Sequence, residues 1–243
     1  MGGANRNPTS FATMVRTGLL SQNAFMSDRY PALVAALLER HGTTFADELG
    51  VNIERNTPSP LFRLLCLAML TSAPVQADIA MRAARAMADA GWTTPKKLAD
   101  STWSQRVKVL NGAGYARVDE KTATQLKDFN DTLLSEYGGD LRRLREAADG
   151  DTDTAIKKLM AFKGIGKVGA SIFLREVQAA WPEFYPFADK ATLKAASTLG
   201  LGEDAESLSR QVSQSDFVRL IAALVRTQLA NDFQAIREAA GHN

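Results

Sequence analysis

The sequence predicts an all-α fold built from two packed helical lobes. Apolar residues recur at intervals of three and four along most of the chain, and this spacing places them on one face of a helix. No long stretch alternates with period two, and only VNIER at 51–55 could form a short extended segment. With 243 residues, of which 45% are hydrophobic, the chain can bury a substantial core. We expect a central lobe at about 60–180 and a second lobe from about 26–58 plus 185–243.

Start and stop signals place the individual helices. Gly42 and Gly91 follow periodic segments, as glycines do after helix ends. Ser59, which is followed by a proline, starts one helix, and Ser101 or Thr102 caps another. In chain order, helices are expected at 30–42, 59–70, 76–91, 94–101, 101–112, 119–139, 189–200 and 215–241, with a further helical pair inside 153–178.

Residues 1–25 form an N-terminal extension ahead of these helices. We expect it either to be loosely attached or to dock as an extra helix over 10–22. It has one arginine before position 10 and no apolar core, which argues against a signal peptide. No run of 18 apolar residues predicts a membrane span, and the single cysteine, Cys66, fits a reducing cytoplasm.

The most specific pattern lies between residues 155 and 194. AIKKLMAF predicts a short amphipathic helix, KGIGKVGA a tight turn, and SIFLREVQ a second helix. Gly164 and Gly166 allow positive φ in the turn and close approach of another backbone. A helix, a glycine hairpin and a second helix are therefore expected at 153–178.

The hairpin can be interpreted in two ways. Its amides, together with those at the start of the second helix, form a partly positive concavity suited to a phosphate, and Lys163 and Lys167 add charge beside it. Contacts of this kind position a protein on a duplex without reading its sequence. The alternative is a plain connector between two helices.

A lone carboxylate, Asp189, follows in the segment YPFADKATLK. As the residue before a helical pattern it is a good N-cap. The order of a helix, a glycine hairpin, a second helix and this acid gives a second interpretation, in which Asp189 is catalytic.

Four segments resemble one family, the endonuclease III branch of the helix-hairpin-helix (HhH-GPD) DNA glycosylases. FKGIGKVGA at 162–170 resembles the family's L-P-G-V-G-x-K-T-A hairpin, and FADKATLK at 187–194 resembles its V-D-T-H-x-x-R segment. SPLFRLLCLAMLTSAPVQAD at 59–78 is similar to S-P-F-E-L-L-I-A-x-L-L-S-A-Q-A-T-D, and GYARVDEKTATQLKD at 114–128 to G-x-Y-x-x-K-A-x-x-I. The similarity covers about residues 28–235.

The resemblance implies a base-excision DNA repair enzyme that extrudes a base from duplex DNA. Asp189 matches the family's catalytic carboxylate. The positions that the resemblance assigns to DNA contact are Lys163, Gly164, Ile165, Gly166, Lys167, Val168, Gly169 and Lys190.

A departure from the family pattern bears on the chemistry. Val168 occupies the position of the lysine that attacks the sugar in bifunctional members, and valine cannot be a nucleophile. The resemblance therefore implies a monofunctional glycosylase, in which Asp189 stabilises an oxocarbenium-like sugar and orients water. In the bifunctional alternative, Lys190 or Lys194 supplies the amine.

The donor set excludes the metal cluster of many relatives. One thiolate, Cys66, cannot hold a four-cysteine iron–sulfur cluster. Neither His41 nor His242 has a ligand partner nearby in sequence, so no zinc site is expected. A monovalent cation held by hairpin carbonyls around 162–167 is the one metal that the resemblance allows.

The pocket is the least determined part of the site. Gln76 is the candidate for filling the space left by the extruded base, although SAPVQAD can equally be an interhelical turn. Tyr185 and Phe187, just before the acid, are candidates to stack against the base, as are Trp181 and Tyr115, with core packing as the alternative.

The predicted partner is double-stranded DNA with a damaged, mispaired or abasic site, bound by a monomer in the cytoplasm, on the nucleoid. A net charge of +2 and a pI of about 8.7 suit DNA where the basic residues cluster. Two alternatives remain: a catalytically silent protein that binds damaged DNA by shape, and a purely structural helical protein.

Overall fold

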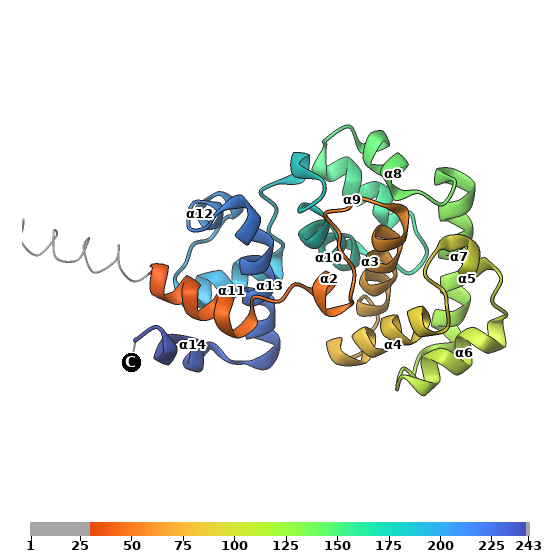
Figure 1. Cartoon of the computed structure of the whole chain (residues 1–243), viewed down its shortest axis with the longest axis horizontal. Helices are drawn as coiled ribbons and strands as arrows, with labels where there is room; N and C mark the ends of the chain where they lie inside the picture. The colour runs from red at the N-terminus through yellow and green to blue at the C-terminus, as the bar shows by residue number, and fades with distance from the viewer. Residues whose placement is uncertain (1–29, 242–243) are drawn as a thin grey trace, which may run out of the picture.

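The computed structural model describes residues 30–241, which consist of helices joined by turns and loops, with no strand in that range (Figure 1). The predicted all-α class is confirmed. Residues 51–55, the expected extended segment, contain no strand, and residues 53–55 form a bend and a turn. The predictions for the N-terminal extension and for His242 lie outside the described residues.

The helices follow the order expected from their caps. Residues 30–41 are helical and are followed by α2 (Phe45–Glu48), α3 (Pro58–Thr71), α4 (Ala77–Asp89), α5 (Pro95–Ala99), α6 (Trp103–Gly112), α7 (Asp119–Tyr137), α8 (Leu141–Ala148), α9 (Thr152–Met160), α10 (Lys167–Val177), the 3-10 turn η1 (Pro182–Phe184), α11 (Lys190–Leu199), α12 (Ala205–Ser209), α13 (Gln214–Ala230) and α14 (Phe233–Ala239). Thr102 caps α6 through a reciprocal capping box with Gln105.

Two features differ from the sequence prediction. The expected helix at 215–241 is broken, because Asn231 adopts a left-handed conformation (φ 53°) that ends α13. Three short helices, α2, α8 and α12, were not predicted. Each has a side-chain cap at its start, from Thr44, Asp140 and Asp204.

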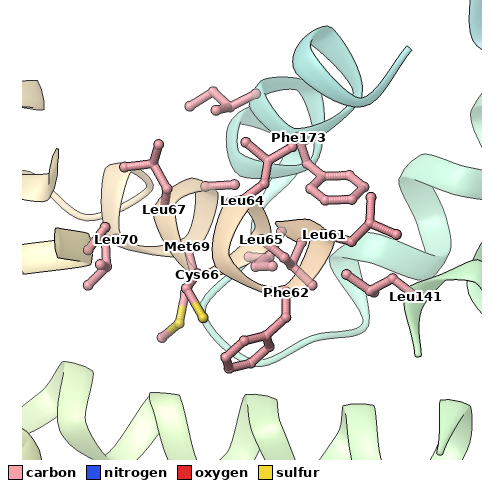
Figure 2. Close-up of a cluster of buried hydrophobic side chains, with 14 of the residues drawn as sticks. Leu61, Phe62, Leu64, Leu65, Cys66, Leu67, Met69, Leu70, Leu141 and Phe173 are labelled. Carbon is pink, nitrogen blue, oxygen red and sulfur yellow. The ribbon is translucent and has the colours of Figure 1, made fainter. Parts of the chain in front are cut away.

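The larger of two hydrophobic clusters surrounds α3 (Figure 2). α3 is buried on nearly all sides, as expected for a helix whose sequence is apolar around its whole circumference. Figure 2 shows Leu61 and Leu64 on the side of Phe173 from α10, with Phe62 below them. This packing fixes α10, and with it the hairpin, against the centre of the cluster.

The smaller cluster joins residues 33–37 to α11, α13 and α14. Residues 46–53, which we predicted in the second lobe, pack in the larger cluster instead, through Ala46, Leu49, Val51 and Ile53. The chain therefore crosses from one cluster to the other immediately after residue 42, and α2 lies at the crossing, beside α10 (Figure 1).

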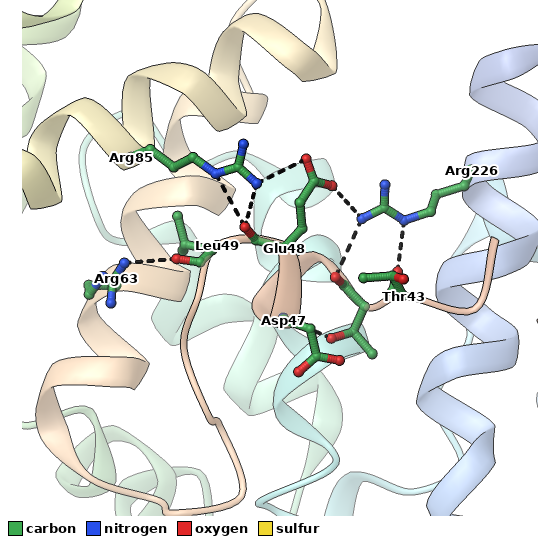
Figure 3. A network of polar contacts seen from close by, with 8 residues as sticks. Thr43, Asp47, Glu48, Leu49, Arg63, Arg85 and Arg226 are labelled. Atoms are coloured by element: carbon green, nitrogen blue, oxygen red, sulfur yellow. Dashed lines mark hydrogen bonds and ion pairs between the residues drawn. The ribbon is translucent and has the colours of Figure 1, made fainter.

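Three arginines bind the crossing segment, residues 43–49, which connects the two clusters (Figure 3). Arg226 of α13 donates to the Thr43 carbonyl at 2.8 Å and to Glu48 Oε2 at 2.6 Å. Arg85 of α4 donates to the Glu48 carbonyl at 2.5 Å, and Arg63 of α3 to the Leu49 carbonyl at 2.8 Å. The segment is thus bonded to helices of both clusters, which positions them relative to each other.

Within residues 30–241, none of the helices combines the length and the apolar composition that a membrane crossing requires.

Candidate functional site

A cavity of about 800 Å³ lies where the two clusters meet. Residues of α2, α3, α4, α10, α11 and α13 line it, together with His41. Most of its lining is apolar, with a few charged side chains, which is typical of a ligand pocket. The cavity brings together Gln76, Val168 and Asp189, three of the residues that the sequence selected.

The N-terminus of α10 lies at this cavity and has no side-chain cap. Its N-cap is Gly166, and the amides of Lys167, Val168 and Gly169 have no acceptor among the described residues. Val168 is 66% exposed, which is unusual for a valine at the start of a buried helix. Unpaired amides at a helix start carry partial positive charge and suit an anion.

The three glycines of the hairpin have three different roles. Gly164 has φ +88°, and a Cβ there would lie 3.0 Å from Met69 Cε. Gly169 has ordinary helical geometry, but its Cβ would lie 2.1 Å from Ser72 Oγ, so it permits the close packing of α10 on α3. Gly166 was expected to allow positive φ and close approach of another backbone, and it uses neither: its φ is −95°, and a Cβ there would meet nothing within 4 Å. That open space faces outward, where a ligand could approach.

The predicted DNA-contacting residues divide between surface and core. Lys163, Lys167 and Lys190 are exposed. Ile165 is only 4% exposed and belongs to the larger cluster, and Gly169 is buried against α3. The side chains of these two residues therefore shape the hairpin from inside, and their assignment to DNA contact stays a prediction.

A second, shallower hollow of about 530 Å³ lies beside the hairpin. Lys167, Lys190 and Lys194 all line it, and Asp189 lies between the hollow and the main cavity. Residues separated by more than 20 positions thus form one basic surface next to the start of α10.

Asp189 is the N-cap of α11, and both oxygens of its carboxylate accept hydrogen bonds. Oδ1 accepts hydrogen bonds from the Thr192 amide at 2.9 Å and from Thr192 Oγ1 at 2.7 Å. Oδ2 accepts from Arg175 Nη1 at 3.0 Å. The side chains of Arg175 and Asp189 are 4% and 9% exposed, so this is a buried ion pair.

Arg175, Phe45 and Arg226 are site residues that the sequence analysis missed. All three line the cavity. The guanidinium carbons of Arg175 and Arg226 lie 5.4 Å and 4.1 Å from the centroid of the Phe45 ring. The available signal was the charged pair Arg175–Glu176 inside the otherwise apolar SIFLREVQ, since buried charges require partners.

Glu176 anchors α2 behind the cavity. Its Oε2 accepts a hydrogen bond from the Ala46 amide at 2.9 Å, and burial raises the pKa of its carboxyl above the ordinary glutamate value. The neighbouring charge of Arg175 acts in the opposite direction.

Neither of the two aromatic residues predicted for the pocket lines the main cavity, and Phe187 lines the shallower hollow together with Asp189. Tyr185 packs edge-on against Phe217 of the smaller cluster, with centroids 5.1 Å apart, and Phe187 packs on the larger cluster. The other aromatic candidates are core residues. Trp181 is fully buried, and Tyr115 donates to the Leu70 carbonyl at 2.7 Å while burial raises its pKa to about 12.

The remaining predictions on the site stay open. Gln76 is the N-cap of α4, makes no capping hydrogen bond and lines the cavity. That it fills the space left by an extruded base stays a prediction, with an interhelical turn as the alternative. Neither Lys190 nor Lys194 lines the main cavity. A monovalent cation at the hairpin carbonyls of 162–167 remains a prediction.

The available donors do not fit a metal cluster. Cys66 is the chain's single cysteine, and burial raises the pKa of its thiol, which disfavours the thiolate that a metal needs. In residues 30–241, no three histidine, cysteine, aspartate or glutamate residues are grouped as metal ligands. His41 Nε2 lies 2.9 Å from Asp232 Oδ2.

Comparison with known proteins gives one structural likeness. No protein-family model matches the chain, and no curated protein matches it. A solved structure that is similar is that of a trapped endonuclease III–DNA covalent intermediate, the estranged-adenine complex. It shares 15% sequence identity over 67% of this chain and 71% of that chain, with a TM-score of 0.44. Identity at this level does not transfer the role of any residue.

Proposed function

We propose that this protein is a monofunctional DNA glycosylase that hydrolyses the N-glycosidic bond of a damaged or mispaired base in duplex DNA. The observation that carries the proposal is the convergence of an uncapped helix start, Val168 and Asp189 at one cavity. An anion site and a carboxylate beside an apolar cavity are what base extrusion and glycosidic hydrolysis require.

The DNA backbone would be held at the start of α10. The amides of residues 167–169 donate to a phosphate, the open space at Gly166 allows it to approach, and Lys167 and Lys190 add charge. Because these contacts read no base, they position the duplex without selecting a sequence. The extruded nucleotide then enters the cavity.

Asp189 would act on the sugar. Its carboxylate stabilises the oxocarbenium-like sugar as the base leaves and orients the attacking water. Thr192 and Arg175 fix the carboxylate before substrate arrives, so little reorganisation is needed during the reaction. Val168 presents methyl groups at the position where a lysine would attack, so water completes the reaction.

Base release from a panel of lesion duplexes tests this proposal. Duplexes carrying alkylated, oxidised, deaminated and mismatched bases would be incubated with wild type and with Asp189→Asn, then analysed with and without hot alkali. We expect release that needs alkali to reveal strand breaks and that falls by about a hundredfold or more in the variant. Release that Asp189→Asn leaves unchanged would contradict the role of the carboxylate.

Val168→Lys provides the complementary test. An amine at this position would face the cavity beside Asp189. We expect borohydride to trap a covalent adduct between Val168→Lys and abasic duplex, and no adduct with wild type. A wild-type adduct would favour the bifunctional alternative, and replacing Lys190 and Lys194 in turn would then locate the amine.

The hydrogen bonds that the Asp189 carboxylate already accepts favour one other candidate function. Both carboxylate oxygens are already bonded, as they would be in a purely structural cap. A catalytically silent protein that binds distorted or abasic duplex would use the same surface. It would release no base from any duplex while binding abasic DNA with salt-dependent affinity. A purely structural protein would show no such affinity.

A further inference from the structure

Phe45 and Glu48 of α2 and Arg226 of α13 form one wall of the cavity. In this wall an accessible guanidinium lies against an aromatic ring. Arg226 lies 4.1 Å from the Phe45 centroid and is 21% exposed, whereas Arg175 is 4% exposed and paired with Asp189. Both Phe45 and Arg226 line the cavity. Of the two arginines, Arg226 is therefore the one that a ligand can reach.

At this wall both carboxylate oxygens of Glu48 accept hydrogen bonds, whereas one nitrogen of Arg226 remains free to donate. Glu48 accepts through Oε1 from Arg85 at 3.4 Å and through Oε2 from Arg226 at 2.6 Å. Arg226 donates through Nε to the Thr43 carbonyl and through Nη2 to the Thr44 carbonyl and Glu48, as Figure 3 shows. Its Nη1 has no partner among the described residues. The wall therefore offers a free N–H donor, while the charge of Arg226 is balanced by Glu48, which lines the same cavity.

We propose that Arg226 determines which bases this cavity accepts. Its Nη1 donates to an exocyclic carbonyl oxygen of the extruded base and opposes an exocyclic amino group, which is itself a donor. The cavity thus selects bases that present a carbonyl oxygen to Arg226. This inference rests on the proposed function in one respect, namely that the cavity receives an extruded base.

Phe45 is a positioning residue for Arg226. Its ring supports the guanidinium plane, and the hydrogen bonds to Thr43 and Glu48 fix the plane's rotation. Because a guanidinium held on several sides loses little freedom when it binds, its contact with a carbonyl is favourable and directional.

Two pyrimidine lesions of nearly equal size separate hydrogen bonding from shape. Uracil has carbonyl oxygens at positions 2 and 4, whereas 3-methylcytosine has a nitrogen donor at position 4. Each would be placed opposite guanine in the same duplex, and the ratio of the two dissociation constants would be measured by fluorescence anisotropy for wild type and Arg226→Met. The comparison between proteins cancels the different costs of extruding the two bases.

Arg219 provides a matched control on the same helix. It donates to the Gly42 carbonyl at 3.2 Å, so it also binds the crossing segment, but it does not line the cavity. Arg219→Met therefore reproduces the loss of an α13 arginine without changing the wall. Phe45→Leu keeps Arg226 and removes its support, which provides a second test if Arg226→Met folds poorly.

We expect wild type to prefer the uracil duplex, and Arg226→Met to reduce that preference by about tenfold, the scale of one charge-assisted hydrogen bond. Phe45→Leu should reduce it by less, and Arg219→Met by less than about twofold. A wild-type preference for 3-methylcytosine, or a ratio that neither Arg226→Met nor Phe45→Leu changes, overturns the inference. Because binding is the readout, absent base release with an intact uracil preference contradicts only the proposed catalysis.

Discussion

The two helices that begin beside the cavity do so in opposite ways. α11 begins at Asp189, whose carboxylate accepts a hydrogen bond from the Thr192 amide and pairs with a buried arginine. α10 begins at Gly166, which has no side chain, and its first three amides have no acceptor among residues 30–241. In both helices the first amides have no acceptor within the helix itself, and only α11 has a side chain that accepts from one of them.

This contrast indicates where a ligand belongs. A helix start that lacks a cap leaves its amides to water or to an external anion, whereas a capped start holds its own anion in a fixed position. The α10 start is therefore suited to hold DNA, and the α11 start to present a carboxylate to it. Substitutions that make the two starts alike should remove one property at a time.

Removing the α11 cap should have the largest effect. Asp189→Ala deletes the N-cap and leaves the guanidinium of Arg175 buried without its partner, for which we expect a loss of about 3–5 kcal/mol in the free energy of unfolding. Urea unfolding monitored by circular dichroism measures this loss.

Asp204→Ala is the matched control for this prediction. Asp204 caps the short helix α12 through the Ser207 amide at 2.7 Å but has no buried cation beside it. Its loss should cost on the order of 1 kcal/mol. Equal losses at the two positions would show that the ion pair with Arg175 contributes little to stability.

Giving α10 the kind of cap that α11 has should have the next largest effect. Gly166→Asp places a carboxylate over the unpaired amides, in a position where a new Cβ meets nothing within 4 Å. We expect the affinity for abasic duplex to fall by about tenfold to a hundredfold, because the carboxylate repels the phosphate and takes its donors. Stability should rise by about a few tenths of a kcal/mol, since Asp is a better N-cap than Gly.

Gly166→Ala separates charge from bulk in that experiment. It adds a methyl group to the same open space but neither accepts hydrogen bonds nor repels a phosphate. If Gly166→Ala weakens binding as strongly as Gly166→Asp does, the contact is steric, and the anion site at α10 is contradicted.

The sequence predicted the features that depend on neighbouring residues. The periodicity around the hairpin located α9 and α10, and Asp189 preceding KATLKAASTL predicted the cap of α11, because caps and turns act over three or four positions. Gly164 was correctly associated with the turn, and its positive φ explains why.

Features that depend on distant contacts were not predicted. Phe45 and Arg226 lie about 180 positions apart, and no local pattern brings them together. Arg175 is 14 positions from Asp189, but its direction depends on how α10 packs on α3. Tyr185 and Phe187 do not line the main cavity, because proximity to Asp189 in sequence does not determine which cluster an aromatic ring packs in.

A smaller effect is expected from the lysines beside α10. Lys167→Gln removes one charge from the basic hollow without touching the packed core. We expect the affinity for DNA to fall equally for all sequences, and the slope of log K against log salt to become shallower by about 0.9. Titration of labelled duplex at several salt concentrations gives the slope.

Lys97→Gln is the control for the salt experiment. Lys97 is exposed on α5, in the larger cluster and outside the hollow beside the hairpin. It should leave the slope unchanged. If both variants change the slope equally, the charge effect is general and α10 is not the contact.

The smallest effect is expected at the start of α9, the first helix of the hairpin. Asp151 caps this helix through the Thr154 amide at 2.7 Å, and hydrogen bonds from the Thr154 side chain and amide lower the pKa of Asp151 below its ordinary value of 3.8. A carboxyl whose pKa is lowered on folding adds stability above its unfolded pKa and loses it as pH falls through the folded pKa. We therefore expect Asp151→Asn, which keeps a capping oxygen, to change the melting temperature little at neutral pH and to flatten its decline below about pH 4.

Asp153→Asn removes the same charge two residues later, where the carboxylate makes no hydrogen bond in the described residues, and should leave the decline as steep as in wild type. Equal flattening in both variants would mean that general charge repulsion, and not the cap at α9, accounts for the acid sensitivity.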